Sequence, residues 1–415
     1  MNPLYDRLRH ATRREFLRRG AAGFAAFVGA AAVPACGGPA DGEPVSAGGG
    51  GTGPVSNITN LGPLQPPDVN GIRLPFGFTS RIVARSGVAP VPGGSYLWHP
   101  APDGGAVFDG PSGGWIYVSN GESPGGAGGA GALRFDSGGN VVAAYPILAG
   151  TSRNCAGGKM PWGRYLSCEE SGDASLVYDC DPLGMAAAAA LPALGRFNHE
   201  AVAWDAAQGR LYLTEDQPDG GLYRFTPASL IAPGVPNLSV GTLEIARVTP
   251  PGPEGAVTWL PVPDPDGSPV TTRAQAASHT SFNRGEGIVA QGGVVYFVTT
   301  GDNRLWAYDV SYQALMILYD DSTSPTPFLT GVDNIDISAD GDLLVAEDGG
   351  DMQIVALTPG GAIVPVLQVI GQSSSEVTGP AFDPSRRRLY FSSQRGTTGA
   401  DIGGITYEVT GPFIA

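Results

Sequence analysis

The sequence predicts an all-β fold, a β-propeller with about six blades, from two observations. First, the 415 residues include 63 glycines and 37 prolines, while Val, Ile, Tyr and Phe recur in short alternating runs. This composition favours many short strands joined by turns over disorder. Second, one strand pattern repeats along the chain at a nearly constant interval. Amphipathic helices are scarce, and the Ala-rich stretch at residues 184–190 is too short to require one.

The repeated strand shows the period-two alternation of a β-strand. Its six copies lie at residues 115–118, 164–167, 210–213, 294–297, 342–345 and 388–391. The steps are 48, 46, 84, 48 and 46 residues when measured between Tyr117, Tyr165, Leu211, Val295, Leu343 and Leu389. The long step indicates a repeat plus an insertion within residues 226–280, which could hold part of a seventh blade. A β-sandwich, the alternative fold, would not readily give such even steps.

The chain begins with an export signature. The motif Thr12-Arg13-Arg14-Glu15-Phe16-Leu17-Arg18, followed by an apolar run, is typical of a twin-arginine signal peptide, which we place at residues 1–35. A buried N-terminal helix is the alternative. Val33-Pro34-Ala35-Cys36 resembles a lipobox, in which Cys36 is lipidated after cleavage. Residues 36–70 then form a flexible tether and residues 71–415 the catalytic propeller. The prediction is a periplasmic or cell-surface protein.

The formal charge of −15 comes from 39 Asp and Glu against 24 Lys and Arg, and Lys159 is the only lysine. This excess of acids argues against nucleic acid and anionic membranes as partners. A membrane contact is expected only through a lipid at Cys36. Nothing in the sequence indicates an oligomer, so we expect a monomer that collects cations.

In a propeller, the starts of the first strands and the ends of the second strands lie near the axis on one face. The predicted first-strand starts carry Asp103, Cys155, Glu200, Glu286, Asp333 and Glu376. The second-strand ends carry Glu122, Glu169 with Glu170, Glu215 with Asp216, Asp302, Glu347 with Asp348, and Arg395. So many carboxylates at one mouth repel one another unless cations lie between them. Calcium prefers such oxygens, whereas the Cys155 thiolate indicates iron or zinc, so the pattern predicts a multi-metal cluster.

Each of these residues also has a simpler interpretation. Any single acid could cap a turn by accepting backbone N–H groups, and Cys155 could be a buried structural thiol. His199 is either a ligand or a hydrogen-bond donor to a ligand. The alternation that directs Glu200 to the axis turns His199 away and favours the second role. Cys168 and Cys180 either form a disulfide or remain free core thiols.

Short segments at these positions resemble the PhoX-type alkaline phosphatases and related propeller proteins. They keep the family's order over residues 100–410 and include Pro102-Asp103-Gly104-Gly105, Asn154-Cys155-Ala156-Gly157-Gly158, Ser167-Cys168-Glu169-Glu170, Asn198-His199-Glu200-Ala201, Arg284-Gly285-Glu286-Gly287, Gly331-Val332-Asp333-Asn334, Val345-Ala346-Glu347-Asp348, Glu376-Val377-Thr378-Gly379 and Gln394-Arg395-Gly396. Lys159-Met160-Pro161 departs from the Thr-Pro usual in the family, and the chain is shorter than the fully developed phosphatases. We therefore interpret it as a short-form member.

The resemblance implies a metal-dependent hydrolase of small phosphate monoesters that releases inorganic phosphate outside the cytoplasm. Its site would hold two irons bridged by an oxide, with several calcium ions alongside. By this resemblance Cys155 binds iron, and the remaining ligands are Glu170, Glu200, Glu286, Asp333, Glu347 and Glu376, the last three completing the calcium shell. Arg284 or Arg395 would bind the phosphate. The alternatives are a calcium-dependent propeller that binds without catalysis, and a propeller lactonase or phosphotriesterase, whose calcium sites lack a thiolate.

Overall fold

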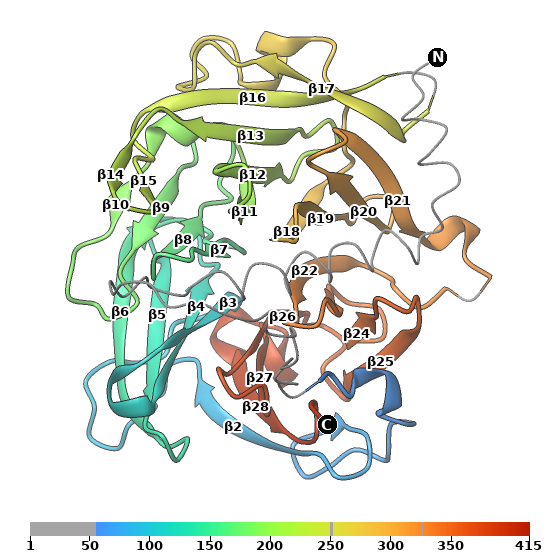
Figure 1. Cartoon of the computed structure of the whole chain (residues 1–415). Coiled ribbons are helices and arrows are strands. Elements are labelled where there is room, and N and C mark those ends of the chain that lie inside the picture. Colours follow the sequence, from blue (N-terminus) through green and yellow to red (C-terminus); the bar gives the residue numbers. More distant parts are fainter. Residues whose placement is uncertain (1–54, 250–251, 326) are drawn as a thin grey trace, which may run out of the picture.

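The computed structural model of the chain describes residues 55–249, 252–325 and 327–415. The predicted signal peptide at residues 1–35 and the predicted lipidation site Cys36 lie outside these ranges. Within them the fold is all-β, and six blades surround a central axis (Figure 1), as the sequence predicts. No helix of the described chain has the length and hydropathy needed to span a bilayer.

Each blade is an antiparallel sheet whose first strand lies at the axis. Blade 1 contains β3 (Pro102–Asp109), β4 (Trp115–Gly121), β5 (Gly128–Phe135) and β6 (Val141–Thr151). Blade 2 contains β7 (Gly158–Lys159), β8 (Tyr165–Cys168), β9 (Val177–Cys180) and β10 (Ala189–Ala190). Blade 3 contains β11 (His199–Asp205), β12 (Arg210–Glu215), β13 (Leu222–Pro227) and β16 (Gly241–Val248).

The second half of the ring repeats this plan. Blade 4 contains β18 (Gly285–Gln291), β19 (Val294–Thr299), β20 (Arg304–Asp309) and β21 (Ala314–Asp320). Blade 5 contains β22 (Val332–Ile337), β23 (Leu343–Glu347), β24 (Gln353–Leu357), β25 (Ile363–Val369) and β1 (Ile72–Arg73). Blade 6 contains β26 (Val377–Phe382), β27 (Arg388–Ser393), β28 (Ile405–Thr410) and β2 (Thr79–Arg85).

The helices of the described chain are single 3-10 turns between strands. They are η1 (Ile58–Asn60), η2 (Pro111–Gly113), η3 (Pro192–Leu194), η4 (Arg273–Ala276), η5 (Asp321–Thr323), η6 (Gly396–Thr398) and η7 (Asp401–Gly403). Their shortness agrees with the scarcity of helical patterns in the sequence.

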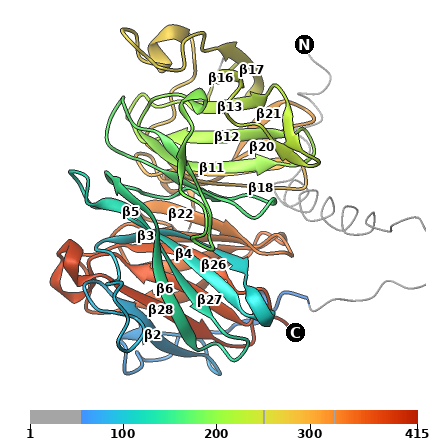
Figure 2. The ribbon, with the colours of Figure 1, turned by 90° about the vertical axis from the view of Figure 1, so that its left-hand side faces the viewer.

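The predicted insertion separates blades 3 and 4 and adds no seventh blade within the described residues. It contains the hairpin of β14 (Leu230–Ala232) and β15 (Val235–Pro236), the added strand β17 (Gly255–Pro261), and η4. β17 lies outside β16 (Figures 1 and 2) and pairs with β16 along one edge and with β21 along the other. It thereby joins the two blades into one nine-stranded sheet.

The N-terminal part of the described chain closes the ring. β2 pairs with β28 and completes blade 6, while β1 adds an outer strand to blade 5. Residues 55–70 pack beside these strands, and the buried side chains of Ile58 and Leu61 belong to the core between blades 5 and 6. The predicted flexible tether therefore extends too far: its described part is anchored by apolar contacts that the Gly- and Pro-rich composition did not reveal.

The core consists of six clusters, one between each pair of neighbouring blades. Where blade 1 meets blade 6, Tyr117 stacks on Tyr390 with ring centroids 5.2 Å apart. Side chains alternate between the two faces of each strand, so a blade contributes apolar side chains to the cluster on either side of it. The loops and strand ends at the axis are left to carry polar side chains.

Candidate metal centre

The first residues of the innermost strands converge at one end of the axis. Three groups of Cys, Asp and Glu in the described chain each bring ligand atoms within 4.8 Å of one another. They are Cys155 with Glu170 and Glu200, Glu200 with Glu286 and Asp333, and Asp103 with Glu122 and Glu376. Glu200 belongs to two groups, and the Cys155 thiol lies 3.6 Å from Asp103 Oδ2. The three groups are therefore parts of one cluster.

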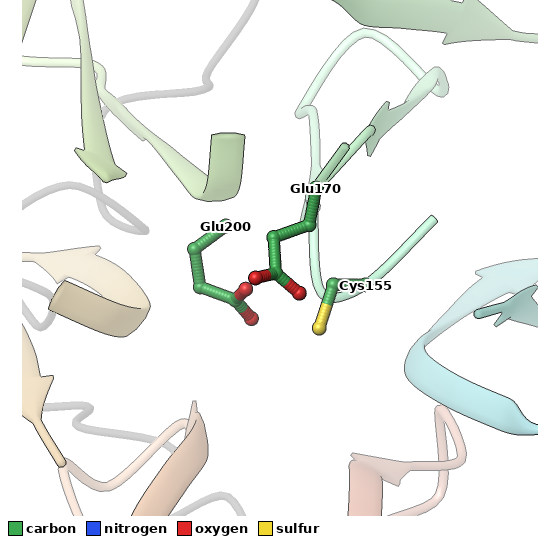
Figure 3. Close-up of side chains that lie close together, drawn as sticks. All are labelled: Cys155, Glu170 and Glu200. Atoms are coloured by element: carbon green, nitrogen blue, oxygen red, sulfur yellow. The ribbon is translucent and has the colours of Figure 1, made fainter. Parts of the chain in front are cut away.

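Figure 3 shows the Cys155 thiol and the carboxylates of Glu170 and Glu200 directed into the same space. Cys155 and Glu170 come from blade 2, on either side of its β7–β8 hairpin, and Glu200 is the second residue of β11. Backbone bonds fix the arrangement: Cys155 N donates to Cys168 O at 3.0 Å, and Glu170 N donates to Arg153 O at 2.8 Å. One soft donor and two hard donors thus face a common point.

The cluster is buried and has too few hydrogen bonds for its charge. Glu200 is fully buried, and neither of its carboxylate oxygens has a hydrogen-bond partner among the described residues. Glu286 Oε1 lies 3.2 Å from Arg284 Nη2 without hydrogen-bond geometry. Buried carboxylates of this kind cost several kcal/mol unless a cation or a proton compensates them. The donor set therefore fits metal ions.

The pKa values of the cluster show the same imbalance. Burial, with a further contribution from Glu122, raises the pKa of Asp103 to about 7. Burial, followed by the charge of Asp216, raises the pKa of Glu170 to about 8. Burial and neighbouring carboxylates raise the pKa of Glu200 and that of Glu286 well above the usual range. Without cations, the three Glu side chains favour the protonated form at neutral pH, and Asp103 is close to half protonated.

Close packing of neighbouring blades brings these side chains together. A Cβ atom on Gly287 would lie 2.6 Å from Ile335 N of the next blade, and one on Gly379 would lie 2.7 Å from Asp103 O. Glycine at these positions lets the innermost strands approach backbone to backbone just beyond the acids. The Gly residues that follow the axial acids in the sequence are therefore part of the site's architecture.

The ends of the second strands follow a simple alternation. In blades 2, 3 and 5 they carry paired acids, Glu169 with Glu170, Glu215 with Asp216, and Glu347 with Asp348. The first acid of each pair accepts backbone N–H groups: Glu169 from Ser152 at 2.8 Å, Glu215 from Gly221 at 2.9 Å, and Glu347 from Thr330 at 3.1 Å. The second acid faces the mouth. The first acid of each pair thus caps a turn, and the side chain of the second is directed towards the mouth, where the cluster lies.

Glu347, which the sequence assigns to the calcium shell, caps a turn in the structure. Both of its carboxylate oxygens accept backbone N–H groups, from Thr330 and Gln353 at 3.1 Å each, and it belongs to none of the three groups. Its exposed neighbour Asp348 contributes instead to the raised pKa of Glu376, after burial, Asp333 and Asp103. The sequence pattern contained this signal, since a strand end directs consecutive side chains to opposite sides.

His199 and the remaining cysteines also lie outside the three groups. His199 faces away from the axis as predicted, but its Nε2 pairs with Gly195 O at 3.0 Å, so it does not donate to a ligand carboxylate. The ring packs on Phe197. Cys168 and Cys180 are free, buried thiols, which leaves the alternative of a disulfide unsupported.

The two predicted arginines lie against the cluster. Arg284 forms a bidentate pair with Asp216, at 2.7 and 2.8 Å. Arg395 Nη1 lies 3.2 Å from Glu376 Oε1, and its Nη2 lies 3.9 Å from Glu122 Oε2. The side chain of Arg284 is 43% exposed and that of Arg395 is 32% exposed. Both guanidinium groups thus reach solvent at the mouth.

The third group, Asp103 with Glu122 and Glu376, shows what the sequence assignment missed. Asp103 and Glu122 stood at blade ends in the sequence but were not assigned as ligands. The amide nitrogen of Gln394 donates to both, at 2.6 Å to Asp103 Oδ2 and 2.9 Å to Glu122 Oε2. Gln394 lies five residues after Leu389, as Glu170, Asp216 and Asp348 do after their own strand markers, so it occupies the position of the strand-end pairs that faces the mouth.

The other end of the axis has a different character. A cavity of about 580 Å³ opens there, lined by the ends of the innermost strands and by Lys159 and Asp336. A narrow space of about 30 Å³ lies between it and the acids. None of the three ligand groups lines the large cavity. We place the candidate centre at the acids because uncompensated buried charge, rather than cavity volume, indicates a metal site.

The model of the alkaline phosphatase PhoX family matches residues 120–184 and 176–322. The chain is thus similar to the PhoX family over residues 120–322. The matched region contains Cys155, Glu170, Glu200, Arg284 and Glu286, and hence most of the cluster. Asp333, Glu376 and Arg395 follow it in the later blades.

One solved structure shares the fold of this chain. PhoX from Pseudomonas fluorescens, solved in complex with vanadate, a transition state analogue, is 18% identical, with a TM-score of 0.67 over 84% of this chain and 97% of that chain. A gluconolactonase from Xanthomonas campestris is 15% identical, with a TM-score of 0.48 over 85% of this chain and 98% of that chain. No curated protein matches the sequence.

Proposed function

We propose that this protein is a metal-dependent phosphatase of the PhoX family that hydrolyses phosphate monoesters and releases inorganic phosphate. The observation that carries the proposal is the buried group of Cys155, Glu170 and Glu200, whose carboxylates lack partners, next to Arg284 at an open mouth. The family match over this region supports it, as does the vanadate complex of the similar Pseudomonas protein.

The donor types suggest how metals would be distributed. Cys155 with Glu170 and Glu200 suits iron, because a thiolate favours a transition metal. Glu200 with Glu286 and Asp333, and Asp103 with Glu122 and Glu376, are all-oxygen groups that suit calcium. We propose two irons and several calcium ions. Bound metals would withdraw charge from the phosphoryl oxygens of an ester and lower the barrier to hydrolysis.

The chain's own residues would orient the ester. The planar guanidinium groups of Arg284 and Arg395 offer paired donors that match two phosphoryl oxygens. Their contacts with Glu286 and Glu376, at 3.2 Å each, hold them beside the cluster before substrate arrives. Burial of the surrounding carboxylates keeps the local dielectric low, which strengthens both sets of contacts.

The proposed cellular location rests on the twin-arginine motif and the lipobox-like segment of the sequence. We propose that the protein is exported through the twin-arginine route and acts in the periplasm or at the cell surface, with a lipid on Cys36 as its membrane anchor. It would act as a monomer on small phosphate esters. Fractionation of cells that express the wild type and a Cys36→Ala variant tests the anchor, since the variant should move from the membrane to the soluble fraction.

Two measurements on natively exported protein test the activity. Elemental analysis should find iron near two per chain together with calcium, and p-nitrophenyl phosphate should be hydrolysed. Cys155→Ala and Glu286→Gln should each abolish turnover, while Cys180→Ala, a buried thiol outside the cluster, should retain it. Calcium without iron and no ester hydrolysis would instead favour a calcium-ordered binding module. Unchanged turnover in both cluster variants would rule out this site.

A further inference from the structure

Three successive blades place a hydrogen-bond donor at the same position of the mouth. Arg153, Asn198 and Arg284 each stand two residues before an axial ligand, which is Cys155, Glu200 or Glu286. Each side chain reaches back to the acid at the end of the preceding blade's second strand. Arg153 lies 4.0 Å from Glu122, Asn198 donates to Glu170 at 2.9 Å, and Arg284 donates to Asp216 at 2.7 Å.

The backbones of Arg153 and Arg284 match as closely as their side chains. Both have a left-handed conformation, with φ of 51° and 59°. Arg153 N donates to Ser123 O at 2.8 Å, and Arg284 N donates to Gln217 O at 2.9 Å, which is in each case the residue after the paired acid. Gly331, at the corresponding position of blade 5, has φ of 67° without strain. Two arginines are thus held rigidly in a conformation that glycine adopts freely.

The two arginines differ in how far protein carboxylates engage them. Arg284 pairs with both oxygens of Asp216 and approaches Glu286. Arg153 approaches only one oxygen of Glu122, beyond hydrogen-bond distance, and its side chain is 52% exposed. Its guanidinium makes no hydrogen bond with any described residue. Of the arginines around the cluster, Arg153 therefore has the most donors free for a ligand.

Arg153 also shares a carboxylate with Arg395. Arg153 Nη1 lies 4.0 Å from Glu122 Oε1, and Arg395 Nη2 lies 3.9 Å from Glu122 Oε2. Arg395 also lies 3.2 Å from Glu376, whereas the approach to Glu122 is the only ion pair of Arg153 within the described part of the chain. Both arginines thus border the cluster at Glu122, but the side chain of Arg153 is 52% exposed and that of Arg395 is 32% exposed.

We propose that Arg153 is a substrate-binding residue that recognises a second anionic group on the alcohol part of a phosphate monoester. This inference rests on the proposed phosphatase function. Arg284 and Arg395, which approach Glu286 and Glu376 at 3.2 Å, hold the phosphoryl group, while the more exposed Arg153 meets the leaving-group side of the ester. The site is then selective for phosphomonoesters that carry a further phosphate or carboxylate.

A matched pair of substrates isolates this contact. Phenyl phosphate and 4-carboxyphenyl phosphate differ by one carboxylate remote from the reacting phosphorus. Their KM values are compared for the wild type, Arg153→Ala, Arg153→Lys and Arg247→Ala, the last being an exposed arginine of β16. Calorimetric binding of phenylphosphonate and 4-carboxyphenylphosphonate, which are not hydrolysed, gives the same comparison without turnover.

The wild type should prefer the carboxylated member of each pair. Arg153→Ala should reduce this preference about tenfold, the size expected for one charge-assisted hydrogen bond at a half-exposed position. Arg153→Lys should retain part of it, Arg247→Ala should retain all of it, and added salt should weaken it. A loss that is equal for both members would assign Arg153 to the phosphoryl group and overturn the inference, as would no loss for either.

Failure of the proposed function is distinguishable from failure of this inference. If the wild type hydrolyses neither ester, the phosphatase assignment fails, and the phosphonates still report binding. Equal wild-type affinity for the two phosphonates would then refute recognition of the second anion by Arg153.

Discussion

The side-chain amide of Asn198, just before β11, donates to Glu170 Oε1 of the preceding blade at 2.9 Å. The same amide donates to Asp216 O at 2.9 Å, and its oxygen accepts from Gly172 N at 2.6 Å. Asn198 is buried, and both its amide nitrogen and its amide oxygen form hydrogen bonds. It therefore fixes one carboxylate of the cluster relative to another blade.

We expect Asn198→Asp to weaken metal binding at the Cys155 group about ten- to a hundredfold, as is typical when a partner of a ligand is lost. The new carboxylate cannot donate to Glu170 and repels it. Iron content after dialysis against graded chelator measures the change. Asn60→Asp, at an exposed position remote from the axis, is the control and should leave the iron content as in the wild type. Equal iron retention in both variants would show that Glu170 needs no such support.

Removal of metals should make stability depend on pH. Burial raises the pKa of Asp103 from 3.8 to about 7 and that of Glu170 from 4.5 to about 8. Because these folded-state values lie above the unfolded ones, the folded chain retains protons that the unfolded chain releases, and stability is lost as pH rises from about 4 to 8. Thermal unfolding of chelator-treated protein should therefore give a lower Tm at pH 8 than at pH 5. Added calcium should restore stability at pH 8, and a Tm that rises with pH would contradict this account.

Glu347 and Asp348 should separate stability from metal binding. Glu347→Gln weakens two hydrogen bonds from backbone N–H groups to a buried carboxylate, so we expect a loss of about 1–3 kcal/mol in unfolding free energy with little change in calcium content. Asp348→Asn, at an exposed position, should instead lower the calcium content with little change in unfolding free energy. Denaturant titration and calcium analysis of both variants check this pair. Calcium loss in Glu347→Gln alone would restore Glu347 to the calcium shell.

A charged contact joins β2 and β28, the two outer strands of blade 6 whose pairing closes the ring. Arg81 of β2 donates to both oxygens of Glu408 of β28, at 2.9 and 2.7 Å. We expect Arg81→Ala to cost about 1 kcal/mol, because the half-exposed guanidinium is screened and Glu408 keeps its bond from Tyr390 at 2.7 Å. Denaturant unfolding of Arg81→Ala should be compared with that of Arg85→Ala, an exposed arginine of the same strand. Equal midpoints for the two variants would show that the pair adds nothing to closure.

The repeat carries most of the information in this sequence. A step near 47 residues, read from strands such as the one at Tyr117, predicts the blades, the insertion and the end of the axis at which Cys155 and Glu200 meet. It succeeds because each blade buries both faces in the same way, so that equivalent positions have equivalent surroundings.

The misses occur where neighbours along the chain have different surroundings. Glu347 and Asp348 are adjacent acids, and only the direction of each side chain at the strand end separates a turn cap from a residue of the mouth. Asp103 and Glu122 of blade 1 form a group with Glu376 only because blade 6 packs against blade 1, and β2 joins blade 6 from more than 300 residues away. Such pairings depend on the closed ring, and no local pattern encodes them.

Closure of the ring by β2 also bears on when the cluster can form. During synthesis β2 emerges early and β28 last among the described strands, yet the two strands pair, and Val83 and Ala84 of β2 belong to the core where blade 6 meets blade 1. Asp103 and Glu376, which share one ligand group, come from those two blades. A chain whose β28 has not yet left the ribosome therefore cannot offer a finished mouth, whatever the supply of ions. Filling of the cluster has to wait until blade 6 has formed.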